Sequence, residues 1–498
     1  MLSRIKSTLS NQIIWSVLLI VICTFGIAIV FYSTVWGAGL TDDSYYYISS
    51  ARNLIAGKGF FHTPIFPPLL SLVLSAIGIF KIDPLISIRW LNATLFAVNI
   101  YLIARIIYTL TKSRFFSLMG VFFTLISSTL IMVHSWAMSE PLFFTFLLFG
   151  LWVYSNGYTK SGWRLPLYTG ILFGLASLTR YIGIALLLSG GIYWLFEKGK
   201  NLRTRFRNAF VFSLVGIFPL SLWLIRNMIL LGEATKRPFG VHLIPANSLV
   251  IMLNAVLLWF IPGRFVYGKE ILWLVGIVIA LLIFLLYRLL LSHKGIGSFT
   301  NLNNQQKPVI LFILCILSCL FILIITRSFF DAKLFIDERE LSPIFVIGLV
   351  LSLCLIAWQW QPSKWLLISL IALIGLVIGI TNFTRSIQMI QSYHEDGRGY
   401  ASARNHISET YAYIRNRPDT PVYSNAFAGI YFWTGRVTYP IPKSDGIAAM
   451  KADMHQSGAL LVIFDSIRVE LYGTTREELT QGLVEQIRLS EATIYRSP

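Results

Sequence analysis

The sequence predicts an all-α, polytopic membrane protein with about eleven transmembrane helices and a small C-terminal extracytoplasmic α/β domain. Of the 498 residues, 56% are hydrophobic and only 13% are charged, against about 25% charged in an ordinary soluble domain. The net charge of +18 is uneven, because residues 385–498 carry 12 basic and 12 acidic side chains and the preceding residues carry 29 and 11. Basic residues that punctuate apolar runs are typical of cytoplasmic loops in membrane proteins, so nucleic acid is not an expected partner.

Eleven apolar runs approach the length of roughly 17–25 residues that a membrane helix needs. They cover residues 13–35, 86–108, 115–133, 141–158, 165–179, 181–196, 208–225, 271–290, 308–326, 341–360 and 365–383. Two short runs meet at Arg180, which predicts a tight turn there rather than one long helix with a buried arginine.

The basic residues indicate the orientation of these helices. With the N-terminus in the cytoplasm, 16 basic residues of the first 383 lie on the cytoplasmic side, accompanied by one acid, Glu197. Merging the two short runs at Arg180 would place the basic cluster 198–207 outside, against the positive-inside tendency. The same topology puts the other ten acids of this part outside, which predicts that the chemistry of a plasma or inner membrane protein faces the extracytoplasmic side.

Two domains follow from the change in composition. Residues 1–383 form the predicted transmembrane module, with a first external loop at about 37–85. Residues 384–498 form the predicted extracytoplasmic domain. Within it, helices are expected at 408–416 and 476–489 and strands at 421–424 and 459–465.

An acidic pair, Asp42 and Asp43, follows the first apolar run. One interpretation is that a carboxylate caps the helix that the following residues predict. The other is that one carboxylate acts as a general base on a hydroxyl group. The two are compatible, because a cap uses only one carboxylate. We assign Tyr46, Arg52 and His62 to the same substrate-facing loop, although its aromatic residues also fit an interfacial belt and His62 alone fits a solvated loop.

A third acid and five basic residues complete the candidate site. Glu140 precedes a proline at a predicted helix start, where the helix dipole favours an acid; alternatively, it is a second acid facing the same cavity as the acidic pair. External basic residues suit a phosphate at the bilayer surface, although some could simply extend to the interface. They are Arg180, Arg226, Arg264, Lys333 and Arg339.

Cofactor motifs are not apparent in the sequence. A glycine-rich phosphate loop is missing, and His, Cys and carboxylate residues show no metal-ligand spacing. We therefore predict no cofactor, and a divalent metal that bridges the acidic loop and a phosphate stays an unsupported alternative.

Several motifs together resemble the GT-C membrane glycosyltransferases, of the protein-mannosyltransferase and lipid A aminoarabinose-transferase type. They are Thr41-Asp42-Asp43, Ala51-Arg52, Gly57-Lys58-Gly59, Pro67-Pro68, Arg89, Ser139-Glu140-Pro141, Thr179-Arg180-Tyr181, Trp223, Arg226-Asn227, Asp337-Glu338-Arg339 and, near the C-terminus, Tyr423 to Asn425 with Gly435-Arg436. The resemblance covers about residues 13–345 and part of the terminal domain.

This resemblance implies a polyprenyl-phosphate sugar as donor and transfer to a hydroxyl of a protein, lipid or glycan, with inversion. It maps the catalytic base onto Asp42, although Asp43 could take either role because the family often has Asp-Glu here. It also implies that Arg180, Arg226 and Arg339 contact the donor phosphate. A transporter or flippase of a lipid-linked anion is the alternative; it predicts charges near the bilayer midplane and inverted repeats, which the sequence does not display.

Overall fold

The computed structural model describes most of the chain: residues 2–60, 65–157, 162–197, 199–261, 307–332, 334–360, 365–417 and 419–498. The chain divides into two compact units. We call Met1–Ser33 with Ser50–Gln391 the helical unit, and Thr34–Ser49 with Ser392–Pro498 the C-terminal unit. A segment from near the start of the chain thus belongs to the C-terminal unit.

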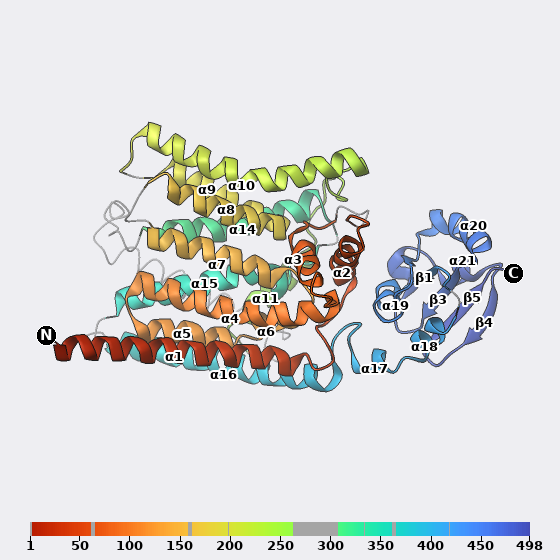
Figure 1. The fold of residues 1–498 in the computed structure, drawn as a ribbon, viewed down its shortest axis with the longest axis horizontal. Helices are drawn as coiled ribbons and strands as arrows, with labels where there is room; N and C mark the ends of the chain where they lie inside the picture. The colour runs from red at the N-terminus through yellow and green to blue at the C-terminus, as the bar shows by residue number, and fades with distance from the viewer. Residues whose placement is uncertain are drawn as a thin grey trace. The chain divides into compact units, whose positions relative to one another are not determined.

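The helices of the helical unit coincide with the apolar runs of the sequence (Figure 1). The long ones are α1 (Leu2–Ser33), α4 (Pro84–Thr111), α10 (Leu202–Leu231), α14 (Pro308–Phe329), α15 (Glu338–Gln359) and α16 (Trp365–Asp396). The shorter ones are α3 (Leu69–Gly78), α5 (Arg114–Leu125), α6 (Ser128–Ser135), α7 (Glu140–Gly157), α8 (Arg164–Thr179), α9 (Ile184–Leu195) and α11 (Ala246–Leu257). The predicted domain boundary at residue 384 falls inside α16.

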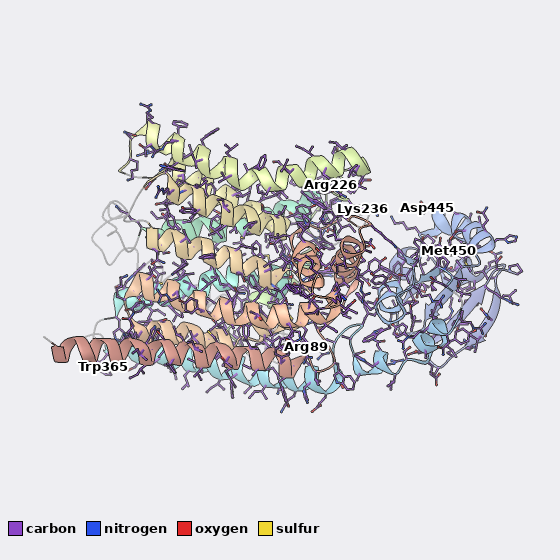
Figure 2. All side chains as sticks on the ribbon, viewed as in Figure 1. Arg89, Arg226, Lys236, Trp365, Asp445 and Met450 are labelled. Carbon is purple, nitrogen blue, oxygen red and sulfur yellow. The ribbon has the colours of Figure 1, made fainter. Side chains whose placement is uncertain are left out.

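Six described helices are long and apolar enough to cross a bilayer, and a seventh span results if the bent pair of α5 and α6 counts as one. Ten of the eleven predicted spans fall on described helices, whereas the run 271–290 lies outside the described residues. Arg226, near the end of α10, and Trp365, at the start of α16, lie toward opposite ends of the helical unit (Figure 2). This is the architecture of a multi-pass membrane protein.

The break between α5 and α6 bends the chain by 57°, and side-chain hydrogen bonds hold the residues around it. The Ser127 hydroxyl accepts from the backbone N–H of Leu130 and so caps α6. The Ser386 hydroxyl donates to the carbonyl of Ile126, at 2.7 Å. Beyond α6, the Asn92 amide donates to the carbonyl of Trp136, at 2.6 Å, and this fixes the connection that leads to Glu140.

The predicted turn at Arg180 is confirmed. Arg180 has an extended backbone between α8 and the 3₁₀ turn Tyr181–Gly183, after which α9 begins. The turn is tight because Gly183 has no side chain: a Cβ there would meet the Cα of Ser177 at 2.4 Å. Likewise, a Cβ at Gly174 would meet the carbonyl oxygen of Gly216 at 2.7 Å, so α8 and α10 approach as closely as small residues allow.

The C-terminal unit contains a five-stranded sheet with the order β2-β1-β3-β5-β4. The strands are β1 (Val422–Ser424), β2 (Thr438–Pro440), β3 (Leu460–Phe464), β4 (Val484–Arg488) and β5 (Ala492–Arg496). β1 pairs in parallel with β2 and β3, whereas β5 is antiparallel to β3 and β4. Every residue of β3 is buried, as expected of a central strand with apolar clusters on both faces.

Helices α17 (Ala403–His406), α18 (Glu409–Arg415), α19 (Phe427–Thr434), α20 (Ile447–Ser457) and α21 (Arg476–Thr480) complete this unit. The predicted α/β class is confirmed, and so are the helix at 408–416 and both strands. The predicted helix at 476–489 is wrong in its second half. The helix ends at Thr480, Gly482 follows with a φ of +77°, and residues 484–488 form β4 because they pair with β5.

Candidate active site

Asp42 and Asp43 are the first two residues of α2 (Asp42–Ile55). The residues beside them supply the cap: the Thr41 hydroxyl accepts from the backbone N–H of Ser44, at 3.4 Å, and the Ser44 hydroxyl accepts from the N–H of Thr41, at 3.0 Å. Because Thr41 occupies the capping position, neither aspartate is needed for it. The capping interpretation of the acidic pair is therefore not needed to explain the start of this helix.

The Asp42 carboxylate is held by the C-terminal part of its own unit. The phenol of Tyr400 donates to Asp42 Oδ1 at 3.0 Å, and Oδ2 has no hydrogen-bond partner among the residues that the structure describes. Burial of the carboxylate raises the pKa of Asp42, and Asp43 raises it further; the Tyr400 hydrogen bond, which favours the ionised form, lowers it but does not offset the increase. The result is a more basic carboxylate with one oxygen fixed.

Phenols surround this carboxylate. Burial, together with the charge of Asp42, raises the pKa of Tyr472 to about 12 and also raises those of Tyr46 and Tyr400. These side chains therefore stay neutral donors at physiological pH. Tyr46, which we assigned to the substrate loop, lies near the acidic pair, and its contact with a substrate stays a prediction.

The backbone around Tyr400 fixes its position. Leu40 and Gly399 form a parallel bridge, in which the N–H of Tyr400 donates to the carbonyl of Leu40 at 2.9 Å. The indole of Trp433 donates to the carbonyl of Tyr400 at 2.8 Å. The acid-bearing segment is thus attached by main-chain hydrogen bonds directly beside the residue that contacts Asp42.

Gly399→Ala is expected to disrupt this attachment. Gly399 has a φ of +56°, and a Cβ there would meet the carbonyl oxygen of Leu40 at 2.0 Å. Gly458→Ala is the matched control, since Gly458 has a φ of +70° and nothing within 4 Å of its Cβ position. The control should lose about 1 kcal/mol of stability from backbone strain alone. Thermal unfolding should show a clearly larger loss for Gly399→Ala, and equal losses would contradict the proposed attachment.

In the helical unit, Glu140, Arg180, Arg339 and Glu340 form a buried ionic network. Arg180 forms an ion pair with Glu140 and donates to both oxygens of Glu340, at 2.9 and 3.0 Å. Arg339 lies 3.6 Å from Glu140 and 3.0 Å from Glu340. The Glu140 side chain is 1% exposed and that of Arg339 is 28% exposed. Two arginines are therefore fixed between two carboxylates, with Arg339 the more accessible.

Helix starts position this network. Glu140 is the first residue of α7, and Arg180 occupies the turn after α8. Asp337 caps α15 by accepting from the N–H groups of Arg339 and Glu340. Asp337 thus sets the direction of two charged residues in the first turn of the helix.

The other predicted residues lie elsewhere or cannot be placed. Arg226 stacks on the rings of Trp223 and Phe60, 5.0 and 5.2 Å from their centroids, and its guanidinium donates to Asn227. Arg52 forms two hydrogen bonds of 3.0 Å with Asp83. Outside the described residues are His62, Arg264 and Lys333.

Sequence reasoning missed Tyr400 and Glu340 as site residues. Tyr400 lies 358 positions from Asp42, and no local pattern links the two. The sequence did contain a pattern that could have pointed to Glu340, because this acid follows Arg339 directly at a predicted helix start. Across the described ranges, no group of three or more His, Cys, Asp or Glu residues could hold a metal ion.

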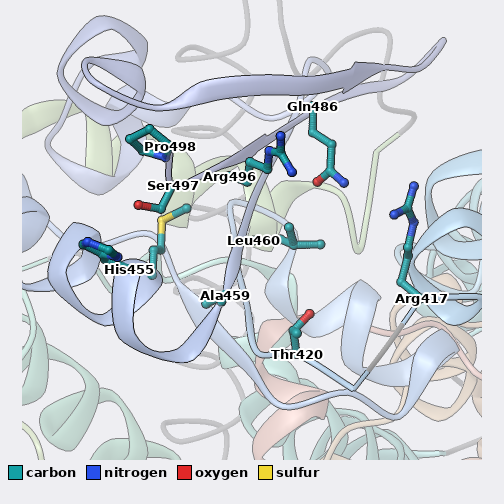
Figure 3. Close-up of a pocket in the computed structure, with 11 residues that line it drawn as sticks. Arg417, Thr420, His455, Ala459, Leu460, Gln486, Arg496, Ser497 and Pro498 are labelled. Atoms are coloured by element: carbon teal, nitrogen blue, oxygen red, sulfur yellow. The ribbon is translucent and has the colours of Figure 1, made fainter.

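A separate cavity of about 300 Å³ opens on the C-terminal unit (Figure 3). Arg417, His455 and Arg496 are among the residues that line it. None of the predicted site residues lines this cavity, so it is distinct from the acidic pair.

Comparison with known proteins identifies the fold. No protein-family model and no curated protein matches this chain. Among solved structures, ArnT from Cupriavidus metallidurans bound to undecaprenyl phosphate superposes with a TM-score of 0.60, at 10% identity, over 97% of both chains. Its apo state gives 0.59, at 11% identity, over 97% of this chain and 98% of that one.

The chain has the GT-C fold. Arabinofuranosyltransferase AftD from Mycobacteria also matches, with a TM-score of 0.55 and 11% identity over 96% of this chain and 41% of AftD. The GT-C fold therefore accounts for both the membrane helices and the C-terminal unit, since the match to ArnT extends over nearly the whole chain.

Proposed function

We propose that this protein is a membrane glycosyltransferase that transfers a sugar from a polyprenyl-phosphate donor to a hydroxyl acceptor. The observation that carries the proposal is the Asp42 carboxylate, fixed through one oxygen by Tyr400 in a chain with the GT-C fold. ArnT, which shares this fold along its whole length, was crystallised with undecaprenyl phosphate. The acceptor is a protein, lipid or glycan on the extracytoplasmic face.

In the proposed reaction, Asp42 removes the proton of the acceptor hydroxyl through Oδ2. The acceptor oxygen forms a bond to the anomeric carbon while the bond between this carbon and the donor phosphate breaks. The configuration at the anomeric carbon is inverted, and polyprenyl phosphate leaves. The raised pKa of Asp42 supports this role, because a base works best when its pKa approaches the working pH.

We further propose that Arg180 and Arg339 stabilise the departing phosphate, with Arg226, Arg264 and Lys333 as further basic contacts. Fixed positive groups where negative charge develops usually make the largest contribution to catalysis. The ion pairs of Glu140 with both arginines favour a positioning role for this acid over a role as a second base.

The test uses the purified protein in vesicles with a donor labelled on the sugar. We expect polyprenyl phosphate and a labelled acceptor to form in equal amounts. If the labelled donor crosses the bilayer intact and no sugar–phosphate bond breaks, the protein is a flippase and the proposal is refuted.

Tyr400→Phe should change the pH dependence of transfer. The Tyr400 hydrogen bond lowers the pKa of Asp42, so its loss raises that pKa further and keeps the base protonated to a higher pH. The acidic limb of the pH profile for kcat/KM is therefore expected to move to higher pH. Tyr423→Phe is the matched control, because Tyr423 donates to Asp453 at 2.8 Å outside the site. An unchanged limb in Tyr400→Phe would exclude Asp42 as the titrating base.

A further inference from the structure

Arg327 is a buried arginine with no carboxylate partner in the described ranges. It lies in the last turn of α14 and is 6% exposed. Its Nη2 lies 3.4 Å from the hydroxyl of Ser248, and its Nε has no hydrogen-bond partner among the residues that the structure describes. No ion pair of Arg327 occurs within the described part of the chain, whereas the nearby Arg237 pairs with Asp331 at 3.8 Å. Buried arginines are almost always paired.

Capping of α14 does not explain this arginine. The carbonyl of Thr326 accepts from the N–H groups of Phe330 and Asp331, at 3.0 and 2.8 Å. The carbonyls of Ser328 and Phe329 accept from His242 and Gly240, at 2.7 and 2.9 Å. Backbone donors therefore already satisfy three of the last four carbonyls of α14 that a basic side chain could otherwise bind.

The position of Ser248, the residue that Arg327 contacts, adds a second observation. Ser248 is the third residue of α11, and Pro245 precedes this helix without a side-chain cap. The start of a helix carries partial positive charge, so a guanidinium beside it is repelled by the helix. An anion between them would stabilise both, and helix starts are common anion sites. Ala246 and Asn247 are exposed, which keeps the first turn of α11 accessible.

We propose that Arg327 and the first turn of α11 bind the phosphate group of a lipid. Both helices carry exposed apolar residues near this position. They are Leu249 and Val250 on α11, and Phe321 and Ile324 on α14. These side chains give a hydrocarbon chain a surface beside the phosphate, which favours a lipid over free phosphate. The argument does not depend on catalysis, and the site shares no residue with the Arg180–Arg339 network.

The test measures thermal unfolding of the full-length protein in a phosphate-free detergent, titrated separately with polyprenyl phosphate, phosphatidylglycerol and inorganic phosphate. Wild type is expected to show a saturable rise in Tm with one of the two lipids, and the responding lipid identifies the source. In Arg327→Met the apparent affinity should fall at least about tenfold, whereas Arg327→Lys should keep part of it. Arg89→Met is the control, because Arg89 is satisfied by the carbonyl of Phe31 at 3.0 Å and by its ring.

The stability without lipid separates binding from a structural role. Because Arg327→Met removes an unpaired buried charge, the lipid-free variant should unfold at or above the temperature of the wild type. A lipid-free variant that is less stable, and whose Tm still rises with lipid as in the wild type, would overturn the proposal. A response to inorganic phosphate alone would overturn the assignment to a lipid.

Discussion

Asp42→Asn is expected to lower kcat for sugar transfer by about a thousandfold, the scale of a lost general base. Asparagine has nearly the same shape, and its amide oxygen can still accept from Tyr400, so the local fold should persist. What the variant lacks is the charge that takes the acceptor proton in the proposed reaction. The measurement is transfer from labelled donor in vesicles, with donor binding followed separately and expected to change little.

Two comparisons make this result specific. Asp453→Asn is the matched control, because Asp453 also accepts a tyrosine hydrogen bond but lies outside the site; it should keep full activity. Asp43→Asn should reduce kcat far less than Asp42→Asn, since Asp42 is the residue that Tyr400 fixes. A fully active Asp42→Asn with an inactive Asp43→Asn would assign the base to Asp43, and wild-type activity in the double variant would refute both assignments.

Glu140→Gln is expected to destabilise the helical unit by about 3–5 kcal/mol, the typical effect of breaking a buried ion pair. The Glu140 side chain is 1% exposed and contacts two arginines, so its neutralisation leaves two guanidinium groups with Glu340 alone. The measurement is thermal or denaturant-induced unfolding of the purified protein.

An exposed pair provides the control for this prediction. Asp465→Asn breaks the pair with Arg476, whose side chains are 47% and 34% exposed, and such pairs contribute at most about 1 kcal/mol. The double variant Glu140→Gln, Arg180→Gln should lose less stability than the sum of its single variants, because the two residues interact directly. Strict additivity would show that the pair contributes nothing.

Patterns that depend on the membrane were predictable from the sequence. The apolar runs had to become helices, since a bilayer leaves no other partner for the backbone, and the two short runs correctly placed a turn at Arg180. The basic residues around Glu140 could each be predicted as candidate site residues. Their joint network could not be predicted, because Arg180 and Glu340 lie 160 positions apart and meet only through helix packing.

The soluble part was less predictable. The residues from Arg476 onward were expected to form one helix, yet the helix ends at Thr480 and the chain continues into β4. The contact of Tyr400 with Asp42 depends on a bridge of single residues, Leu40 and Gly399, which has no counterpart in hydrophobic periodicity. Long-range pairing of this kind follows from the tertiary structure alone.

The composition of the C-terminal unit has a consequence for biosynthesis. Thr34–Ser49 leaves the ribosome more than 300 residues before Ser392, which at 5–20 residues per second is a delay of roughly 20–70 seconds. During that interval Asp42 has no Tyr400 to hold it. A nascent chain already inserted into the bilayer therefore carries the proposed base without its hydrogen-bond partner, and this contact can form only after the C-terminal domain has been translated.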